Sequence, residues 1–509
     1  MENSQPQTSE SIAKNVFYGF LTWVLPLGLS FIATPVIIKT LGDKDYGIYA
    51  LVLGFIGYSF TFSIGRAVTK YIAEYRSSGE AEKIRDVVSA TFFINVGVGL
   101  LGVLFLCLSA NWFVGYVFRI DGEAQSKTVS ALYIAAAIIF LTMLNQVFNA
   151  ILQGIHRFDV YSKIFNASSF ALLFGNLILA WFGYGLLILL GWNFLVIGLT
   201  CAAAAVAAKK LLPEFGISLG FKRETLGLVL KYTSGVIGYQ ILANLLLLFE
   251  RGWIIRQLGA ESLTYYVVPM TLALYIHGLI SSFILVIFPL ASELKSDPEK
   301  LLKLYTKATK IVCLLVVFMA MTLIVESDLF LILWIGENFA EKSASLLIVH
   351  SVTFGLLAIL TVSWQITEGL GFPNYNFRLS VVSLVVSVFL MIGLTENYGN
   401  NGIAAARLTG FAATFFSVFY VEKWFFGKIQ WAFWVRLIRI LVVAAIAGAV
   451  VEYAISVNLP VSWLSLIISV GCGGVVYCLI IWLLDLVTTD EKILVKAILS
   501  RNKINAGKV

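Results

Sequence analysis

Charged side chains at the edges and inside long apolar runs are the residues of this sequence that could carry chemistry. Arg66, Arg251 and Arg407 interrupt or end stretches that otherwise hold apolar and small residues, and Glu250 and Glu368 are their acidic counterparts. A charge costs roughly 2.5 to 3.5 kcal/mol at the centre of a bilayer on insertion scales, so the charges that remain tend to face a cavity or a partner. The arginines predict binding of an anionic group, and the two acids are candidates for binding a coupling ion.

Three charged residues follow one another on a single helix face. Arg66, Lys70 and Glu74 are spaced four residues apart, and residues at that spacing are neighbours on a helix. The pattern is consistent with a basic entrance to a binding site. It is equally consistent with long side chains that reach the lipid headgroups from the end of a membrane helix.

Arg251 and Arg407 also admit two interpretations. Arg251 follows Glu250, and the two form either part of a binding cavity or a pair of charges at a helix end. Arg407 lies several residues inside an apolar stretch on the predicted outer side, where the positive-inside rule gives no reason for a cation. Arg407 therefore faces a cavity or reaches the membrane interface.

The sequence contains no motif that indicates catalysis or a metal site. It has three histidines, with no HExxH, no GxxxxGK[ST] phosphate loop and no GxSxG. The five cysteines all fall in apolar stretches without CxxC or Cys/His spacing, so neither a disulfide framework nor a zinc site is indicated. We predict a protein that is not an enzyme, has no catalytic residues or metal, and does not use ATP directly. Coupling to H⁺ or Na⁺ stays open.

The composition predicts that most of the chain is embedded in a membrane. Of the 509 residues, 59% are hydrophobic and 13% are charged, whereas soluble domains carry about 25% charged residues. The mean hydropathy of +0.90 excludes a cytosolic enzyme. The net charge of +7 does not indicate nucleic-acid binding, because the charges lie between the apolar runs.

Cutting the apolar runs at turn signals gives fourteen predicted membrane helices, each close to the length of about 20 residues that a bilayer requires. Gly183-Tyr184-Gly185 is the predicted turn within the uncharged stretch 164–208. The predicted spans are 15–38, 47–69, 87–110, 129–153, 164–182, 185–207, 232–255, 264–290, 311–334, 344–370, 379–395, 402–421, 437–456 and 463–484.

The positions of Lys and Arg predict the orientation. If the N-terminus is inside, most of the 36 Lys and Arg residues fall in inner segments. We therefore expect a multi-pass protein of the inner, cytoplasmic membrane with both termini in the cytoplasm.

A weak internal repeat favours two similar halves. Residues 37–42 align with 254–259, and the same offset pairs Lys14 with Lys231 and Gly185 with Gly402; chance similarity is the alternative. A repeat of six spans predicts two parallel six-helix lobes plus two C-terminal helices, and facing repeats often enclose a site that opens alternately to each side. The predicted parts are a tail 1–14, an N-lobe 15–208, a cytoplasmic amphipathic linker 209–231, a C-lobe 232–421, an amphipathic segment and two spans 422–484, and a tail 485–509.

Several short motifs resemble one known family. They are LGDKDYGIYAL (41–51), GR (65–66), KYIAEY (70–75), QGIHRFD (153–159) and GLGFPN (369–374). These motifs and the predicted helix count resemble the polysaccharide-export flippases of the multidrug/oligosaccharidyl-lipid/polysaccharide exporter superfamily. The resemblance implies that the chain moves a polyprenyl-pyrophosphate-linked oligosaccharide, the repeat unit of O-antigen, capsule or exopolysaccharide, from the inner to the outer leaflet by alternating access.

The resemblance gives the charged residues roles as hypotheses. Arginine suits pyrophosphate because it donates two parallel hydrogen bonds, so the expected substrate-binding residues are Arg66, Lys70, Arg251 and Arg407. The family often has an Asp-Arg or Asp-Lys pair where this chain has Glu250-Arg251, so the reach is longer by one methylene. The expected ion-coupling residues are Glu250 and Glu368, and Pro26 is the expected hinge, with a static kink as the alternative. Membrane lipids, a polysaccharide polymerase and chain-length machinery are the expected partners.

Other classes of protein fit the sequence less well. An exporter of small amphipathic cations would require acidic cavities, whereas most candidate charges here are basic. A membrane-embedded transferase or polymerase of lipid-linked sugars would need a substantial outer loop, and the longest predicted one, 111–128, is short. A purely structural or assembly protein would not need Arg407.

Overall fold

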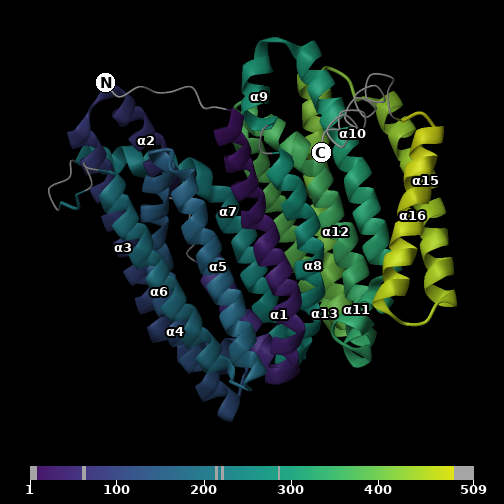
Figure 1. Cartoon of the computed structure of the whole chain (residues 1–509), viewed down its shortest axis with the longest axis horizontal. Helices are drawn as coiled ribbons and strands as arrows, with labels where there is room; N and C mark the ends of the chain where they lie inside the picture. Colours follow the sequence, from purple (N-terminus) through teal and green to yellow (C-terminus); the bar gives the residue numbers. More distant parts are fainter. Residues whose placement is uncertain (1–8, 60–64, 213–215, 219–222, 285–286, 487–509) are drawn as a thin grey trace, which may run out of the picture. The chain divides into compact units, whose positions relative to one another are not determined.

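The computed structural model describes residues 9–59, 65–212, 216–218, 223–284 and 287–486 of the chain. All regular secondary structure within these residues is helical (Figure 1). The chain divides into two compact units, Met1–Thr264 and Tyr265–Val509.

The prediction of an all-helical, multi-pass membrane protein is confirmed. Among the described residues, ten helices are long and apolar enough to cross a membrane. One of them, Pro373–Phe425, extends over two predicted spans. The count of fourteen therefore stays a prediction.

Within its described residues, the first unit holds seven α-helices and one short π-helix, followed by the start of α8. α4 packs against α2, α3 and α6, and α5 packs against α1 and α6. The elements are α1 (Ser9–Tyr58), α2 (Gly65–Ser78), α3 (Ala81–Trp112), η1 (Phe113–Val117), α4 (Glu123–Gly154), α5 (Phe158–Trp181), α6 (Leu186–Leu211) and α7 (Arg223–Leu258).

Helix α1 holds the predicted span 15–38 and the first part of the predicted span 47–69, with a glycine between them. Gly42 has φ 74° and ψ 162°, a backbone conformation that is open almost only to glycine. It lies in the predicted loop between the spans 15–38 and 47–69. The predicted hinge Pro26 and also Pro35 lie inside the helix, and Gly42 is where the non-helical φ and ψ occur. The hinge function of Pro26 stays a prediction.

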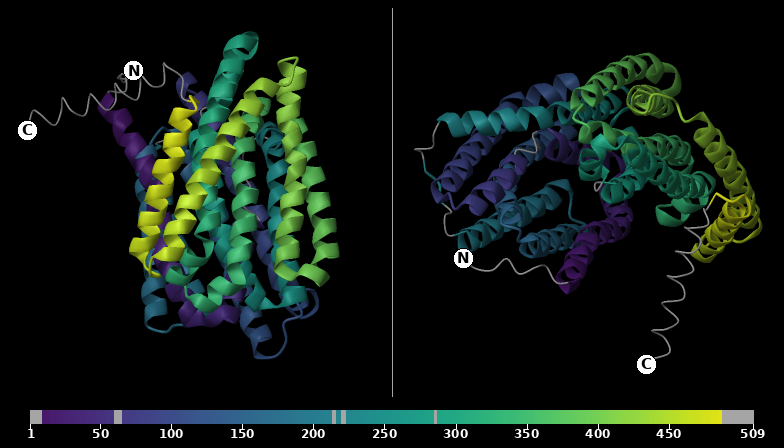
Figure 2. Two further views of the ribbon diagram at one scale, coloured as in Figure 1. Left: turned by 90° about the vertical axis from the view of Figure 1, so that its right-hand side faces the viewer. Right: turned by 90° about the horizontal axis from the view of Figure 1, so that it is seen from above.

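The second unit is organised around α12. This helix packs against α9, α10, α11 and α13. Helix α15 packs against α10 and α16, and α15 and α16 lie side by side in both views of Figure 2. The elements are α8 (Ala260–Ile284, which begins in the first unit), α9 (Ile287–Glu293), η2 (Leu294–Ser296), α10 (Pro298–Val325), α11 (Ser327–Trp334), α12 (Glu337–Gly369), α13 (Pro373–Ala412), η3 (Ala413–Phe415), α14 (Phe416–Phe419), η4 (Tyr420–Phe425), α15 (Trp431–Asn458) and α16 (Trp463–Leu483).

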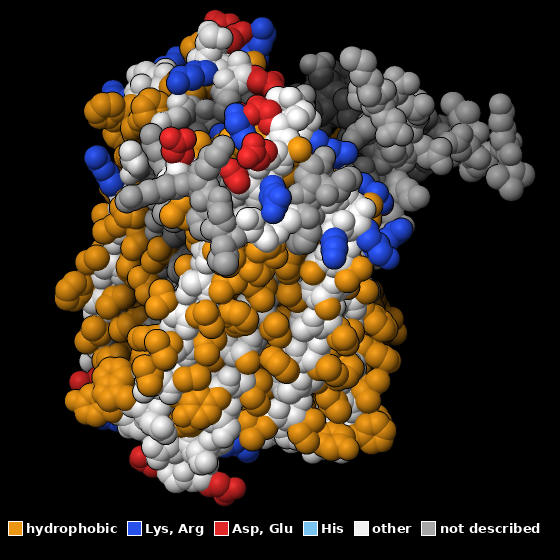
Figure 3. Space-filling view, turned by 90° about the vertical axis from the view of Figure 1, so that its left-hand side faces the viewer, with side chains coloured by type: hydrophobic (Ala, Val, Ile, Leu, Met, Phe, Trp, Pro, Cys, Tyr) orange, Lys and Arg blue, Asp and Glu red, His pale blue; other side chains and the backbone are white. Residues whose placement is uncertain are grey.

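The surface of the helices is typical of a membrane protein. Figure 3 shows apolar side chains covering the middle of one face, with Lys and Arg gathered toward one end. The buried core holds apolar side chains together with small hydroxyl residues, which pack closely between helices.

Several predicted boundaries can be compared with the helices. The turn at Gly183-Tyr184-Gly185 separates α5 from α6, as predicted. The predicted span 311–334 is divided at Glu326 into α10 and α11. The predicted amphipathic segment after residue 421 is π-helical to Phe425, and α15 begins at Trp431.

The division into units differs from the predicted lobes. The predicted linker 209–231 lies partly outside the described residues, and α7 groups with the first unit. Arg256, in the last turn of α7, explains part of this grouping, because it donates hydrogen bonds to the carbonyls of Tyr116 (2.8 Å) and Val117 (2.9 Å) in η1.

Candidate functional site

Arg251 lies buried against the second half of α1 in the first unit. Its side chain is 5% exposed, and Nη1 donates a hydrogen bond of 3.2 Å to the carbonyl of Ala50. The guanidinium carbon is 5.0 Å from the ring centroid of Tyr58, within the range of a cation–π interaction. The preceding residue, Glu250, is fully buried. The adjacent pair from the sequence is therefore placed inside the helix bundle rather than at an exposed helix end.

A glycine makes room for Arg251. A Cβ atom added to Gly54 would lie 2.4 Å from Nη1 and 2.8 Å from Cδ of Arg251. Real Cβ atoms do not come so close to other heavy atoms, and packed interiors have little room to adjust. The absence of a side chain at Gly54 therefore leaves the space that the Arg251 side chain occupies against α1.

Arg407 is the corresponding buried cation of the second unit. It is 1% exposed, and its guanidinium carbon lies 5.8 Å from the ring of Phe354 and 5.6 Å from that of Phe411. It follows the break at Gly399, where α13 has φ 52° and ψ −135°. Arg407 is thus buried within the second unit, and its function in substrate binding stays a prediction.

A histidine lies next to this arginine. His350 of α12 is fully buried, its ring lies 4.7 Å from that of Tyr266 in an edge-to-face arrangement, and it is 6.2 Å from the ring of Phe354. Neither ring nitrogen has a hydrogen-bond partner among the described residues. Tyr266, His350, Phe354 and Arg407 form one buried cluster, and the partly buried Phe411 packs against Arg407.

The predicted basic entrance is described only in part. Arg66 lies in the first turn of α2, and its side chain is outside the described residues. Lys70 is exposed, with Nζ 4.9 Å from the ring centroid of Tyr71. Tyr71 stacks on Tyr75 at 5.9 Å. Whether these cations bind substrate stays a prediction.

The second predicted ion-coupling residue is held by its own helix. Glu368, at the end of α12, accepts a hydrogen bond of 3.0 Å from the indole of Trp364, one helical turn earlier. Its side chain is partly buried. Glu368 belongs to the second unit and Glu250 to the first, so their function in ion coupling stays a prediction.

Buried asparagines tie helices of the first unit together. Asn176 of α5 donates to Oδ1 of Asn193 of α6 at 2.9 Å, and both amides contact the hydroxyl of Tyr49 of α1 at 3.4 Å. Hydrogen bonds of this kind hold membrane helices in register. These asparagines have a structural function that accounts for their burial.

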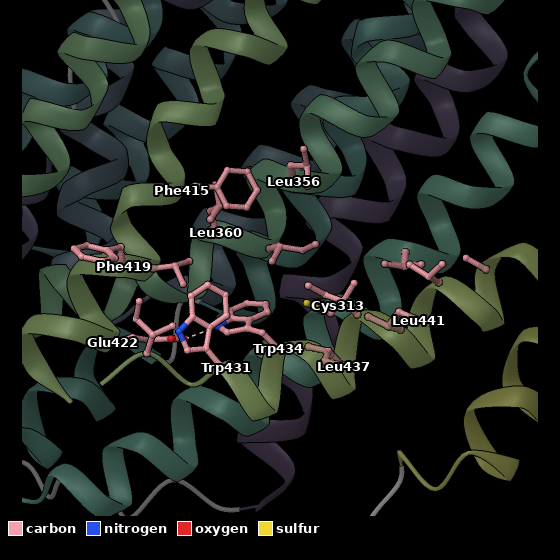
Figure 4. Close-up of a pocket in the computed structure, with 17 residues that line it drawn as sticks. Cys313, Leu356, Leu360, Phe415, Phe419, Glu422, Trp431, Trp434, Leu437 and Leu441 are labelled. Atoms are coloured by element: carbon pink, nitrogen blue, oxygen red, sulfur yellow. Dashed lines mark hydrogen bonds between the residues drawn. The ribbon is translucent and has the colours of Figure 1, made fainter. Parts of the chain in front are cut away.

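An apolar groove follows α15 in the second unit. Its two parts, of about 490 and 350 Å³, share the lining residues Val317, Leu356, Ile359 and Ala445. Helices α10, α12 and α15 line both parts, and Phe415 and Phe419 line the larger one (Figure 4). The side chains of Phe415, Phe419 and Ile446 are between 42% and 60% exposed, so the groove opens on the surface of the unit.

A carboxylate that sequence reasoning missed lies at one end of this groove. Glu422 of η4 is fully buried, and Oε1 accepts hydrogen bonds from Tyr305 (2.8 Å) and from the indole of Trp434 (2.6 Å). Oε2 accepts from the backbone N–H of Gln430 at 2.7 Å. Figure 4 shows Glu422 and Trp434 facing each other. The available signal was an acid immediately after an apolar run, within a segment that otherwise carries tryptophans and cations.

No cluster of three or more His, Cys, Asp or Glu side chains that could hold a metal ion occurs in the part of the chain that the structure describes. The arrangement offers buried cations, an apolar groove and buried acids. These features suit binding and movement of an amphipathic anion rather than covalent chemistry.

Comparisons with known proteins agree with this description. Residues 36–344, more than half of the chain, match the family described as "Polysaccharide biosynthesis protein". Over 396 residues, the chain is 22% identical to a Shigella flexneri protein named "Putative O-antigen transporter". This match covers 77% of the chain and 93% of that relative.

The fold is similar to two kinds of solved transporter. The lipid II flippase MurJ in an inward closed conformation has a TM-score of 0.72 and 15% identity, and the match covers 94% of this chain and 100% of that one. An inward-facing MATE family multidrug resistance transporter of the MOP superfamily has a TM-score of 0.61 and 17% identity, over 79% of this chain and 92% of that one. The chain therefore belongs to the polysaccharide biosynthesis protein family, and it has the fold of the multidrug/oligosaccharidyl-lipid/polysaccharide exporter superfamily.

Proposed function

We propose that this protein moves a polyprenyl-pyrophosphate-linked oligosaccharide from the inner to the outer leaflet of the cytoplasmic membrane by alternating access. The observation that carries the proposal is one buried arginine in each unit, Arg251 and Arg407, each lying against aromatic rings. The membership of the family and the names of the relatives, an O-antigen transporter and a lipid II flippase, support the same substrate class.

Arginine fits the charged part of such a substrate. A pyrophosphate carries dense negative charge, and a guanidinium can donate two parallel hydrogen bonds to it. Retaining an arginine within a membrane helix is costly, which favours a function in binding. We propose that Arg251 and Arg407 bind the pyrophosphate at different stages of the cycle, with Arg66 and Lys70 attracting it first.

The apolar groove fits the lipid part. Its lining is almost wholly apolar and it opens on the side of the unit, so a hydrocarbon chain could enter from the bilayer without crossing a polar surface. Trp431, which is 67% exposed, marks one end of the groove, and exposed tryptophans are typical of the membrane interface. We propose that the polyprenyl chain occupies this groove while the sugars cross.

The remaining expectations belong to the same proposal. Both termini would lie in the cytoplasm, and a polysaccharide polymerase would consume the transported unit. The energy would come from H⁺, Na⁺ or the membrane potential.

The test is the accessibility of lipid-linked oligosaccharide at the outer leaflet in cells that lack this gene. The cells carry the wild-type protein, Arg251→Ala, Arg407→Ala or the matched control Arg439→Ala, whose arginine is exposed on α15. Membrane levels of each protein are measured in parallel.

The proposal expects complete units to accumulate on the inner leaflet in the deletion strain and in the two buried-arginine variants, but not in the control. If units reach the outer leaflet without the protein and remain unpolymerised, the protein is not the flippase. A transferase or polymerase function would then account for the phenotype.

A further inference from the structure

Two buried carboxylates lie close together at the far end of α10 and α15. Glu326, which follows the last residue of α10, is 2% exposed, and Glu452 of α15 is fully buried. Their charges interact electrostatically. Acids are seldom buried in pairs, because two negative charges in an apolar environment repel each other and lose their hydration.

The two helices exchange hydrogen bonds at this point. Thr322 of α10 donates to Oε1 of Glu452 at 3.0 Å, and Ser456 of α15 donates to Oε2 of Glu326 at 3.0 Å. On each helix the hydroxyl and the acid are four residues apart, so both lie on one helix face. The crossed bonds bring two carboxylates and two hydroxyls into one cluster, which we call the oxygen quartet: Thr322, Glu326, Glu452 and Ser456.

No basic side chain neutralises the quartet within the described part of the packed helices. The nearest cations along α10 and α15, Lys310 and Arg439, precede Thr322 and Glu452 by at least twelve residues, which is about 18 Å along a helix. On α12, Lys342 donates to the hydroxyl of Tyr265. The acid of α11, Asp328, is exposed.

The other titratable groups of these helices make contacts elsewhere. On α16, Tyr477 donates to the carbonyl of Leu314, and Cys472 and Cys478 are exposed. On α12, His350 lies in the cluster around Arg407. The negative charge of the quartet is therefore not balanced by the protein's own described side chains.

Part of each carboxylate also lacks a hydrogen-bond partner. Oε1 of Glu326 and Oε2 of Glu452 are buried and accept no hydrogen bond from any described residue. A buried carboxylate oxygen without a donor is costly, because it has lost its hydration without gaining a hydrogen bond. A positive ion between the two acids would remove both the repulsion and this cost.

The neighbouring helix closes the site tightly. A Cβ atom added to Gly473 of α16 would lie 2.2 Å from Cγ and 2.8 Å from Oε1 of Glu452. Glu452 therefore fills the space that a side chain at position 473 would need, and its carboxylate is enclosed between α10 and α16.

We propose that the oxygen quartet binds one monovalent cation, H⁺ or Na⁺, between α10 and α15. A proton shared by the carboxylates would leave a single negative charge, and Na⁺ would take hard oxygen ligands from the same four side chains. The smaller part of the apolar groove, lined by Met321, Ile324 and Ala449, adjoins the quartet. Occupancy of the site therefore stabilises the contact between α10 and α15 next to this groove.

The experiment is thermal unfolding of the full chain in nanodiscs. Two series compare the wild type with the double variant E326Q/E452Q and with the control D328N. The control removes an exposed acid two residues from Glu326. One series varies Na⁺ against choline at fixed pH and ionic strength, and the other varies pH without Na⁺.

Each outcome decides the proposal. A melting temperature that rises by a few degrees with Na⁺ in wild type and D328N, but not in the double variant, establishes a sodium site. A rise that occurs only as the pH falls, measured relative to the double variant, establishes a proton site. The proposal is overturned if wild type responds to neither ion, or if the double variant keeps the response.

A second measurement guards against a double variant that does not fold. A scintillation proximity assay compares the binding of radioactive sodium to wild type, E452Q and S456A. These single variants are chosen because they leave most of the packing in place. S456A is expected to weaken binding and E452Q to abolish it in the sodium case. None of these measurements involves the lipid-linked substrate, so the cation site and the proposed transport function can fail independently.

Discussion

Tyr305 of α10 donates a hydrogen bond of 2.8 Å to the buried carboxylate of Glu422, a residue 117 positions later in the chain. The same carboxylate oxygen accepts from the indole of Trp434 at the start of α15. One acid thus joins α10, η4 and α15. Since burial of a carboxylate is tolerated only when its oxygens are hydrogen-bonded, Tyr305, Trp434 and the backbone N–H of Gln430 together stabilise Glu422.

Removing the tyrosine hydroxyl should therefore destabilise the second unit. Tyr305→Phe leaves the ring in place but removes one donor from a buried carboxylate, which costs about 1–3 kcal/mol. The matched control is Tyr398→Phe, because Tyr398 is 64% exposed and its change should stay within about 0.5 kcal/mol. Thermal unfolding in detergent checks both, and equal melting temperatures for the two variants would contradict the prediction.

Gly54→Ala should reduce transport as strongly as Arg251→Ala does. The added methyl group cannot share space with the guanidinium, so Arg251 must leave its position on α1. A lost charge-assisted contact of this kind corresponds to a decrease of about tenfold or more. Gly57→Ala is the control, since nothing lies within 4 Å of the added atom on the same helix. Delivery of lipid-linked oligosaccharide to the outer leaflet is measured, and a fully active Gly54→Ala would refute the positioning function.

Gly42→Ala should weaken the junction within α1. The conformation at φ 74° and ψ 162° is strained for any residue with a Cβ atom, by about 1–3 kcal/mol. Gly28→Ala in the helical part of the same element should be neutral or stabilising by up to about 1 kcal/mol, because alanine favours helix and nothing lies within 4 Å. The order of the melting temperatures, with Gly42→Ala below wild type and Gly28→Ala at or above it, checks the prediction.

The start of α10 should depend on pH. Asp297 accepts a hydrogen bond of 3.1 Å from the backbone N–H of Lys300, and its carboxylate also pairs with the Lys300 ammonium at 2.8 Å. The ammonium first, and the N–H second, hold the pKa of Asp297 below its usual value. Because the folded-state pKa is lowered, the stabilisation is present above the pKa of the unfolded chain and is lost as the pH falls through the folded-state pKa.

The measurement is hydrogen exchange of the first turn of α10 in wild type and Asp297→Ala. At neutral pH the variant should exchange faster, and the difference should vanish in acid. Asp297→Asn, which keeps an N-cap acceptor without the charge, should behave alike at both pH values. A difference between wild type and Asp297→Ala that does not change with pH would count against the assignment.

Much of the fold could be predicted from the sequence, because the bilayer demands long apolar helices. The turn at Gly183 was predicted from two glycines in an uncharged stretch, and Gly183 has φ 80°. The predicted helix boundaries were less accurate where the break between two helices has neither glycine nor proline. The predicted span 311–334 is interrupted by Glu326 near one end, and the structure ends α10 and begins α11 at this charge.

The sequence predicted which residues of the candidate site are unusual, but not which residues they contact. A charge in an apolar run indicates burial, and Arg251 and Arg407 are buried. Their partners could not be predicted, since Arg251 meets Ala50 across 201 residues. Glu422 was missed because it follows residue 421, where an interfacial segment was predicted, and because its partner Tyr305 is 117 residues away.

The crossed bonds at one end of α15 and the Glu422 carboxylate at the other together determine how this helix can move. Trp434 and Glu452 are 18 residues apart, which is about 27 Å along a helix. Trp434 near one end of α15 bonds Glu422 of η4, and Glu452 near the other end bonds Thr322 of α10, whereas the residues of α15 between them that line the groove are apolar. Sliding of α15 along α10 would therefore break the polar contacts at both ends, whereas outward displacement of its middle part would break only apolar contacts.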